Sequence, residues 1–247
     1  MEAAQRIRHA VQQVSTLRAE CDRAPALAAA VREVKGLQAR RFGGSYADML
    51  SGGEHAAAAR FFLDELYSDK DYAERDAQFS RIAGAMQTFF PAQVVQTAVA
   101  LAELHALTEE LDHRMGCAWL AAALPGDPPA RRYVQAWREV GRRDDRDRQL
   151  VTVLGIGNEM ARLTRTPGLG LMLRMMRGPA SAAGLDSFQR FLEAGFETFA
   201  RMARRRENAK AFLAIIEERE RQLIEMLFDA SPVACETRLQ HLLGLAR

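Results

Sequence analysis

The stretch "PAQVVQTAVALAELHALTEELDHRMGCAWL", residues 91–120, decides the fold class. Ala, Leu, Glu, Gln and Met dominate it, all of them strong helix formers, and Pro91 suits the first turn of a helix. At 100° per residue its apolar side chains share one stripe. The stripe consists of Leu101, Leu104, Leu107, Leu111, Met115 and Ala118. The pattern predicts a long helix over residues 91–123 with one face in the core.

The same helical periodicity continues along the whole chain, and β-branched runs are scarce. Glycine and proline clusters mark the breaks between the helical patterns. Helices are predicted at residues 2–22, 26–41, 54–67, 71–88, 91–123, 128–141, 145–165, 168–177, 184–205, 207–229 and 233–245. The fold class is therefore predicted to be all-α, a compact multi-helix bundle of about ten helices.

The clearest linker is "LPGDPPARR", residues 124–132, with three prolines and one glycine. It divides the sequence into an N-terminal helical half, residues 1–124, and a C-terminal half, residues 125–247, which we expect to pack as one compact unit. The C-terminal half is rich in Met and Phe between residues 167 and 202. Such a segment is typical of core, and it could also form a dimer interface or an apolar ligand pocket.

Composition excludes several classes of function. The 247 residues include 34 Lys and Arg against 32 Asp and Glu, so the net charge of +2 gives no reason to expect nucleic-acid binding. The three cysteines are far apart, which suits a reducing compartment. The N-terminus lacks a signal-peptide pattern, and the longest apolar run, residues 117–124, is shorter than the roughly 20 residues of a membrane span. We predict a soluble cytoplasmic protein without a membrane span.

One edge of the long stripe carries a polar seam. His105, Glu109 and Asp112 fall along two helical turns and are candidates for ligand binding or acid–base chemistry. The structural alternative is a histidine at a helix–helix interface, bonded to a carboxylate. As metal ligands the candidates are His105, Asp112 and His113, although His113 is predicted on the far, solvent-facing side. Cys117 follows His113 by four residues, without a second group to orient the imidazole.

A second set of acids lies in "RFFLDELYSDKDYAERDAQF", residues 60–79. The carboxylate of Glu65 lies beside aromatic residues, so we expect it to pair with an arginine or to face a ligand. The arginine candidates are Arg60, Arg75 and Arg81. We predict that helix 54–67 packs against helix 91–123 and brings Glu65 near His105 and Asp112. The predicted core residues are Phe62, Leu66, Leu104 and Leu111.

The segment "VTVLGIGNEMA", residues 151–161, contains the beginning of a dinucleotide-binding glycine pattern. Met160 stands where the third glycine is needed, and no strand is predicted before it. We therefore interpret Gly155 and Gly157 as positions of close helix packing.

The stretches "RFFLDELYSDKDYAERDAQFSRI" and "LAELHALTEELDH" resemble a group of uncharacterised helical proteins, mostly from proteobacteria. The resemblance covers most of the chain and implies an all-α bacterial cytoplasmic protein, without an activity or cofactor. From the residues we predict a module that binds a small apolar ligand or a partner helix, which could belong to a second copy. The alternative is a metal- or haem-dependent enzyme with a polar site around Glu65, His105 and Asp112.

Overall fold

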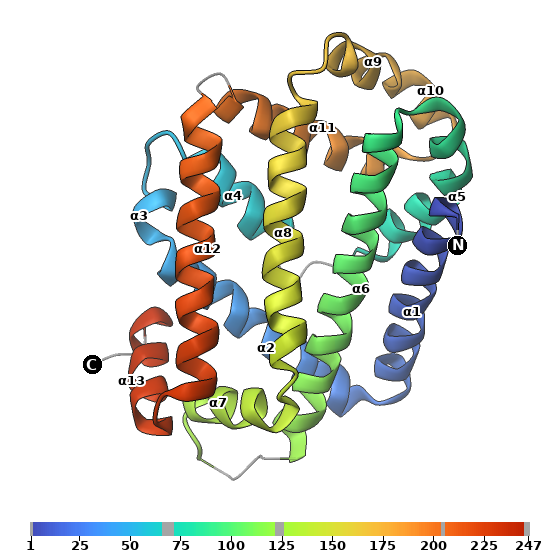
Figure 1. The fold of residues 1–247 in the computed structure, drawn as a ribbon. Helices are drawn as coiled ribbons and strands as arrows, with labels where there is room; N and C mark the ends of the chain where they lie inside the picture. The colour runs from blue at the N-terminus through green and yellow to red at the C-terminus, as the bar shows by residue number, and fades with distance from the viewer. Residues whose placement is uncertain (1, 66–71, 122–125, 204–205, 245–247) are drawn as a thin grey trace. The chain divides into compact units, whose positions relative to one another are not determined.

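The computed structural model describes residues 2–65, 72–121, 126–203 and 206–244 (Figure 1). Within these ranges the regular structure is helical, and none of it is β-strand. The helices are α1 (Ala3–Arg23), α2 (Pro25–Ser45), α3 (Ala47–Leu50), α4 (Ala56–Glu65), α5 (Ala73–Phe89), α6 (Ala92–Ala121), α7 (Pro129–Val140), α8 (Arg143–Leu163), α9 (Leu169–Met175), α10 (Arg177–Ala182), α11 (Asp186–Ala203), α12 (Arg206–Asp229) and α13 (Pro232–Leu242). The all-α prediction is confirmed.

Local sequence signals explain several helix ends. Pro25, Pro129 and Pro232 stand in the first turns of α2, α7 and α13, where a missing N–H costs nothing. At α13 the Ser231 hydroxyl accepts a hydrogen bond from the backbone N–H of Ala234, which is an N-cap contact. Helix α7 ends where Gly141 adopts a positive φ of 61°, a conformation that favours glycine.

The chain divides into two compact units, and each of them draws on three segments. Unit 1 comprises Met1–Ser15, Lys70–Ala106 and Thr152–Ala214, and unit 2 comprises Thr16–Asp69, Leu107–Val151 and Ile215–Arg247. Helices α1, α6, α8 and α12 each contribute residues to both units. The proline-rich linker suggested two halves that meet between residues 124 and 125, and the division into units 1 and 2 does not follow that boundary.

The core of unit 1 is built largely from alanine and a few larger side chains. In it, Phe79 of α5 and Phe188 of α11 stack with their ring centroids 4.8 Å apart. The other buried members are Ala4, Ile7, Ala10 and Val14 of α1, Ala83 of α5, and Ala98, Val99, Ala102 and Ala106 of α6. Small residues on two helices allow the helix axes to approach closely, so the alanine-rich faces of α1 and α6 are packing faces.

The core of unit 2 holds the larger aromatic residues. Trp119 of α6 is buried, and Arg132 stacks its guanidinium over the indole at 4.0 Å. Close packing is also visible at Gly116, where an added Cβ would lie 2.5 Å from Val31 Cγ2 of α2. The predicted core residues Phe62 and Leu111 are buried in this unit, and Leu104 is buried in unit 1. Leu66 lies outside the described residues.

The glycines of "VTVLGIGNEMA" lie inside helix α8, as a packing role requires. A Cβ on Gly157 would lie 2.6 Å from Leu213 Cδ2, so glycine allows this close contact and a larger residue would require the Leu213 side chain to shift. Gly155, in contrast, has open space where its Cβ would be. Close helix packing therefore explains one of the two glycines.

Gly44 of α2 provides a test of packing in unit 2. A Cβ at this position would overlap the backbone carbonyl oxygen of Leu242 in α13, and backbone atoms cannot move aside without shifting a helix. We expect Gly44→Ala to lower the free energy of unfolding by about 1–3 kcal/mol. Gly43→Ala is the matched control, because nothing lies within 4 Å of its Cβ. It should stabilise the helix by up to about 1 kcal/mol in the same urea titration.

Candidate functional site

His105 and Asp76 form a carboxylate–histidine pair in unit 1. His105 Nε2 of α6 lies 2.9 Å from Asp76 Oδ2 of α5. Asp76 is 4% exposed, whereas the His105 side chain is 20% exposed. An ionised carboxylate only accepts hydrogen bonds, so Nε2 carries the hydrogen. The other ring nitrogen, Nδ1, has no hydrogen-bond partner among the residues of the described ranges.

Aromatic rings flank this pair. The ring centroid of Tyr72 lies 6.5 Å from that of His105, in an edge-to-face arrangement. Arg75 stacks its guanidinium over Tyr72 at 3.8 Å and over Phe191 of α11 at 4.4 Å. These contacts hold α5 and α11 together beside the imidazole. The result is a partly exposed histidine whose orientation is fixed by a buried acid.

Glu109 and Asp112 of the predicted seam lie in unit 2, where α2 supplies their partners. Lys35 Nζ lies 2.6 Å from Glu109 Oε1, and Gln38 Nε2 donates to Asp112 Oδ1 at 3.0 Å. Asp112 is only 3% exposed. Both carboxylates therefore have polar partners inside the protein, and both partners are 74 residues away in the sequence.

Burial controls the protonation of this region. Burial raises the pKa of the Asp112 carboxyl above its ordinary value, and the nearby charge of Lys35 offsets only part of this effect. Burial alone would lower the pKa of Lys35, but the charges of Asp112 and Glu109 reverse this and leave it raised. Burial also raises the pKa of Tyr133 of α7. Unit 2 thus encloses ionisable groups that are largely removed from water.

A third buried contact lies further along α2. Arg41 Nη1 donates to Glu220 Oε1 of α12 at 2.5 Å, and the Tyr46 hydroxyl donates to the same oxygen at 2.9 Å. All three side chains are buried. We call Lys35, Gln38, Arg41, Tyr46, Glu109, Asp112 and Glu220 the polar cluster of unit 2. Its contacts join α2 to α6 and to α12, so it is well suited to fixing α2 against these two helices.

The raised pKa of Asp112 predicts a pH dependence of stability. A carboxyl whose pKa is higher in the folded state stabilises the fold most when protonated, and this contribution is lost as the pH rises through the folded-state pKa. We expect Asp112→Asn to remove this dependence. In urea unfolding between acidic and neutral pH, the parent should lose stability relative to the variant as the pH increases. Parallel pH profiles of the two proteins would contradict the assignment.

Glu65 lies at the C-terminal end of α4 in unit 2 and is half-buried. Arg60, one of its expected partners, donates instead to the backbone carbonyl of Leu50. His105 belongs to unit 1, so an approach of Glu65 to His105 stays a prediction. Residue 71, where one predicted helix begins, lies outside the described residues.

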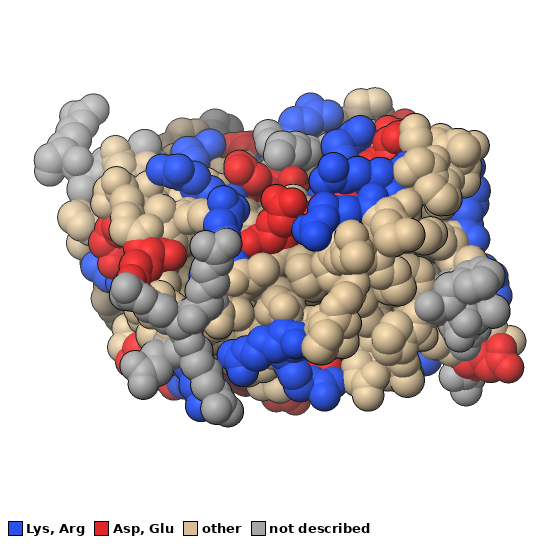
Figure 2. All heavy atoms as spheres, turned by 90° about the horizontal axis from the view of Figure 1, so that it is seen from above, with Lys and Arg blue, Asp and Glu red and all other residues tan. Residues whose placement is uncertain are grey.

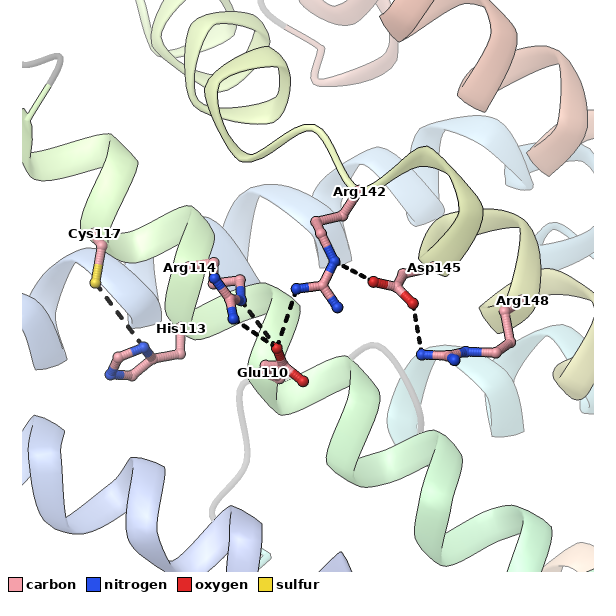
Figure 3. Close-up of polar contacts among 7 residues, drawn as sticks. All are labelled: Glu110, His113, Arg114, Cys117, Arg142, Asp145 and Arg148. Atoms are coloured by element: carbon pink, nitrogen blue, oxygen red, sulfur yellow. Dashed lines mark hydrogen bonds and ion pairs between the residues drawn. The ribbon is translucent and has the colours of Figure 1, made fainter.

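The prediction that His113 faces solvent is wrong, because its side chain is 14% exposed. Its Nε2 lies 3.2 Å from Glu20 Oε2 of α1, an ion-pair distance without hydrogen-bond alignment. Figure 3 shows its Nδ1 directed at the sulfur of Cys117. In the part of the chain that the structure describes, no group of three or more His, Cys, Asp and Glu side chains is placed to hold a metal ion.

Arginine side chains of unit 2 pair with the half-buried Glu110 and the buried Asp145. In Figure 3, Glu110 of α6 contacts both Arg114 and Arg142, and Asp145 contacts Arg142 and Arg148. On the face that carries α9, Lys and Arg side chains likewise lie among Asp and Glu side chains (Figure 2). Exposed pairs contribute little to stability.

An open groove runs between α6 and α8 within unit 1. Its volume is about 530 Å³, within the range of small-molecule sites. Its lining residues are Ala92, Gln93, Gln96, Thr97, Ala100, Gly155, Ile156 and Glu159. The sequence did not indicate this groove, because its residues are small or polar and come from two helices about 60 positions apart.

These features define an all-helical protein with several polar contacts inside unit 2 and a partly exposed carboxylate–histidine pair in unit 1. The family model described as "Domain of unknown function (DUF8198)" matches residues 17–234, and the chain belongs to that family. No curated protein matches the chain, and no solved structure matches it. Among the described helices none is both long and apolar enough to cross a membrane.

Proposed function

We propose that this protein binds a small molecule that combines a hydrogen-bonding group with an apolar body, and that His105 is its polar anchor. The supporting observation is the partly exposed imidazole, held at Nε2 by buried Asp76 and without a described partner at Nδ1. When the imidazole is neutral, with its hydrogen on Nε2, the Nδ1 atom can accept a hydrogen bond from a ligand. When the imidazole is charged, Nδ1 can donate one to a ligand. Tyr72 offers the neighbouring apolar surface.

Two aromatic fragments test this proposal. Phenol offers a hydroxyl donor and benzoate offers a carboxylate acceptor, so they cover both hydrogen-bonding states of Nδ1. We expect at least one of them to shift the imidazole resonances of His105 in nitrogen–proton NMR spectra, and His105→Gln to weaken its binding by about tenfold, the loss of one good hydrogen bond.

His9→Gln is the matched control, because His9 is an exposed residue of the same unit. It should bind the fragment as the parent does. If neither fragment moves the His105 resonances, or if His105→Gln binds as tightly as the parent, the proposal is wrong.

The groove between α6 and α8 supports a second candidate function, the binding of a partner helix. The open space at Gly155 is where a bulky residue of the partner would fit. The simplest partner to test is a second copy of the chain. Sedimentation velocity should then show a concentration-dependent dimer that Gly155→Trp abolishes, whereas a monomer at every concentration would exclude self-association.

A further inference from the structure

Cys117 differs from the other two cysteines in what surrounds it. All three are free thiols. Cys235 is buried, and its sulfur donates to the carbonyl oxygen of Met226 at 3.0 Å. Cys21 is half-buried on α1. Cys117 is exposed on α6, with its sulfur 3.9 Å from His113 Nδ1 (Figure 3).

The imidazole of His113 joins this thiol to a carboxylate on another helix. Its Nδ1 faces Cys117, and its Nε2 lies 3.2 Å from Glu20 Oε2. The order is therefore thiol, imidazole, carboxylate, all within unit 2. In such an arrangement a base takes the proton of the nucleophile while a third group orients the base. The spacing of His113 and Cys117 was visible in the sequence, but Glu20 is 93 residues away from His113.

The thiol of Cys117 is protonated at neutral pH, so a reaction at its sulfur needs a base such as His113. Burial raises the pKa of Cys117, and the negative charge of Glu20 raises it further, so the thiol keeps its proton at neutral pH. Only the thiolate is a strong nucleophile. A reaction of Cys117 therefore needs an acceptor for the proton, and the nearest described nitrogen base is His113 Nδ1.

We infer that Cys117 is a site of oxidation by hydrogen peroxide, with His113 accepting the thiol proton and Glu20 positioning the imidazole. The thiolate sulfur attacks one peroxide oxygen, a sulfur–oxygen bond forms and the oxygen–oxygen bond breaks. The departing hydroxide takes the proton from His113 and leaves as water. Sulfur is oxidised by two electrons to a sulfenic acid, and peroxide is reduced to water.

The test measures sulfenic acid formation at each cysteine of the full-length protein. Hydrogen peroxide is added with dimedone as the trap, and labelled peptides are quantified by mass spectrometry over time. We expect Cys117 to react faster than Cys21 and Cys235. In His113→Gln the rate at Cys117 should fall by about tenfold or more, the loss of a general base, while the rate at Cys21 stays unchanged.

Two further variants separate base catalysis from exposure. In His113→Gly, free imidazole should restore much of the rate at Cys117, which a purely structural role of His113 would not allow. In Glu20→Gln the rate should fall by a smaller factor, about threefold, and added imidazole should not restore it, because His113 is still present.

The matched control is His241→Gln, an exposed histidine of unit 2, which should react as the parent does. Melting temperatures of all variants show whether they are folded. If folded His113→Gln is oxidised at Cys117 as fast as the parent, exposure alone explains the reactivity and the inference fails. Absence of rescue by imidazole would overturn the role of His113 in the same way.

Discussion

Glu220→Ala is expected to lower the free energy of unfolding by about 3–5 kcal/mol, because it removes one carboxylate of a buried ion pair. The Glu220 oxygen accepts hydrogen bonds from both Arg41 and Tyr46. Water cannot replace it easily, since all three side chains are buried. Chemical denaturation of the parent and the variant measures the loss.

A double variant separates the stability contribution of the ion pair from that of side-chain packing. Replacing both Arg41 and Glu220 by Met removes both charges and keeps apolar volume, so the double variant should lose less stability than Glu220→Ala. Glu217→Ala is the control on the same helix. Glu217 pairs with Arg221 at the surface at 2.5 Å, so its removal should cost less than about 1 kcal/mol. Equal losses from Glu217→Ala and Glu220→Ala would contradict the buried role.

The helices could be predicted because their signals are local. The pattern placed the longest helix at residues 91–123, and α6 spans Ala92–Ala121. Residues 178–183 lie between the predicted helices 168–177 and 184–205, because Gly178 and Pro179 usually break helices, yet α10 spans Arg177–Ala182. Proline is tolerated in a first helical turn, and the turn is fixed by buried Ala180 and by the Arg177–Glu193 ion pair. Tertiary contacts thus formed a helix where the local signal indicated a break.

The faces of α6 were only partly predictable. Leu104, Leu111, Met115 and Ala118 are buried as the stripe predicted, whereas Leu101 and Leu107 are only partly buried. A helical wheel gives the direction of each side chain and does not show which neighbours cover that direction. Therefore Asp112, placed at the edge of the stripe, could not be recognised as a fully enclosed carboxylate.

The partners of the candidate site residues could not be read from the sequence. Asp76 of α5 holds His105 of α6, which is 29 residues away in the sequence. This contact matches the structural alternative of a histidine bonded to a carboxylate between helices. Pairings of this kind depend on which helices become neighbours, and one sequence contains no signal for them.

Leu111→Ala should produce the other large loss of stability, about 2–5 kcal/mol. Leu111 is 0% exposed, and truncating its side chain would remove apolar contacts and leave a cavity that the packed helices can fill only in part. Urea unfolding followed by circular dichroism at 222 nm gives the change.

Leu120 is the matched control, because it lies on the same helix in the same unit and is 42% exposed. Leu120→Ala removes the same atoms and causes the same change in helix propensity, so the difference between the two variants isolates burial. We expect Leu120→Ala to change stability by no more than about 0.5 kcal/mol. If the two substitutions cost the same, the stripe on α6 does not form the core of unit 2. In that case the buried position of Asp112, which depends on the same helix orientation, would also be wrong.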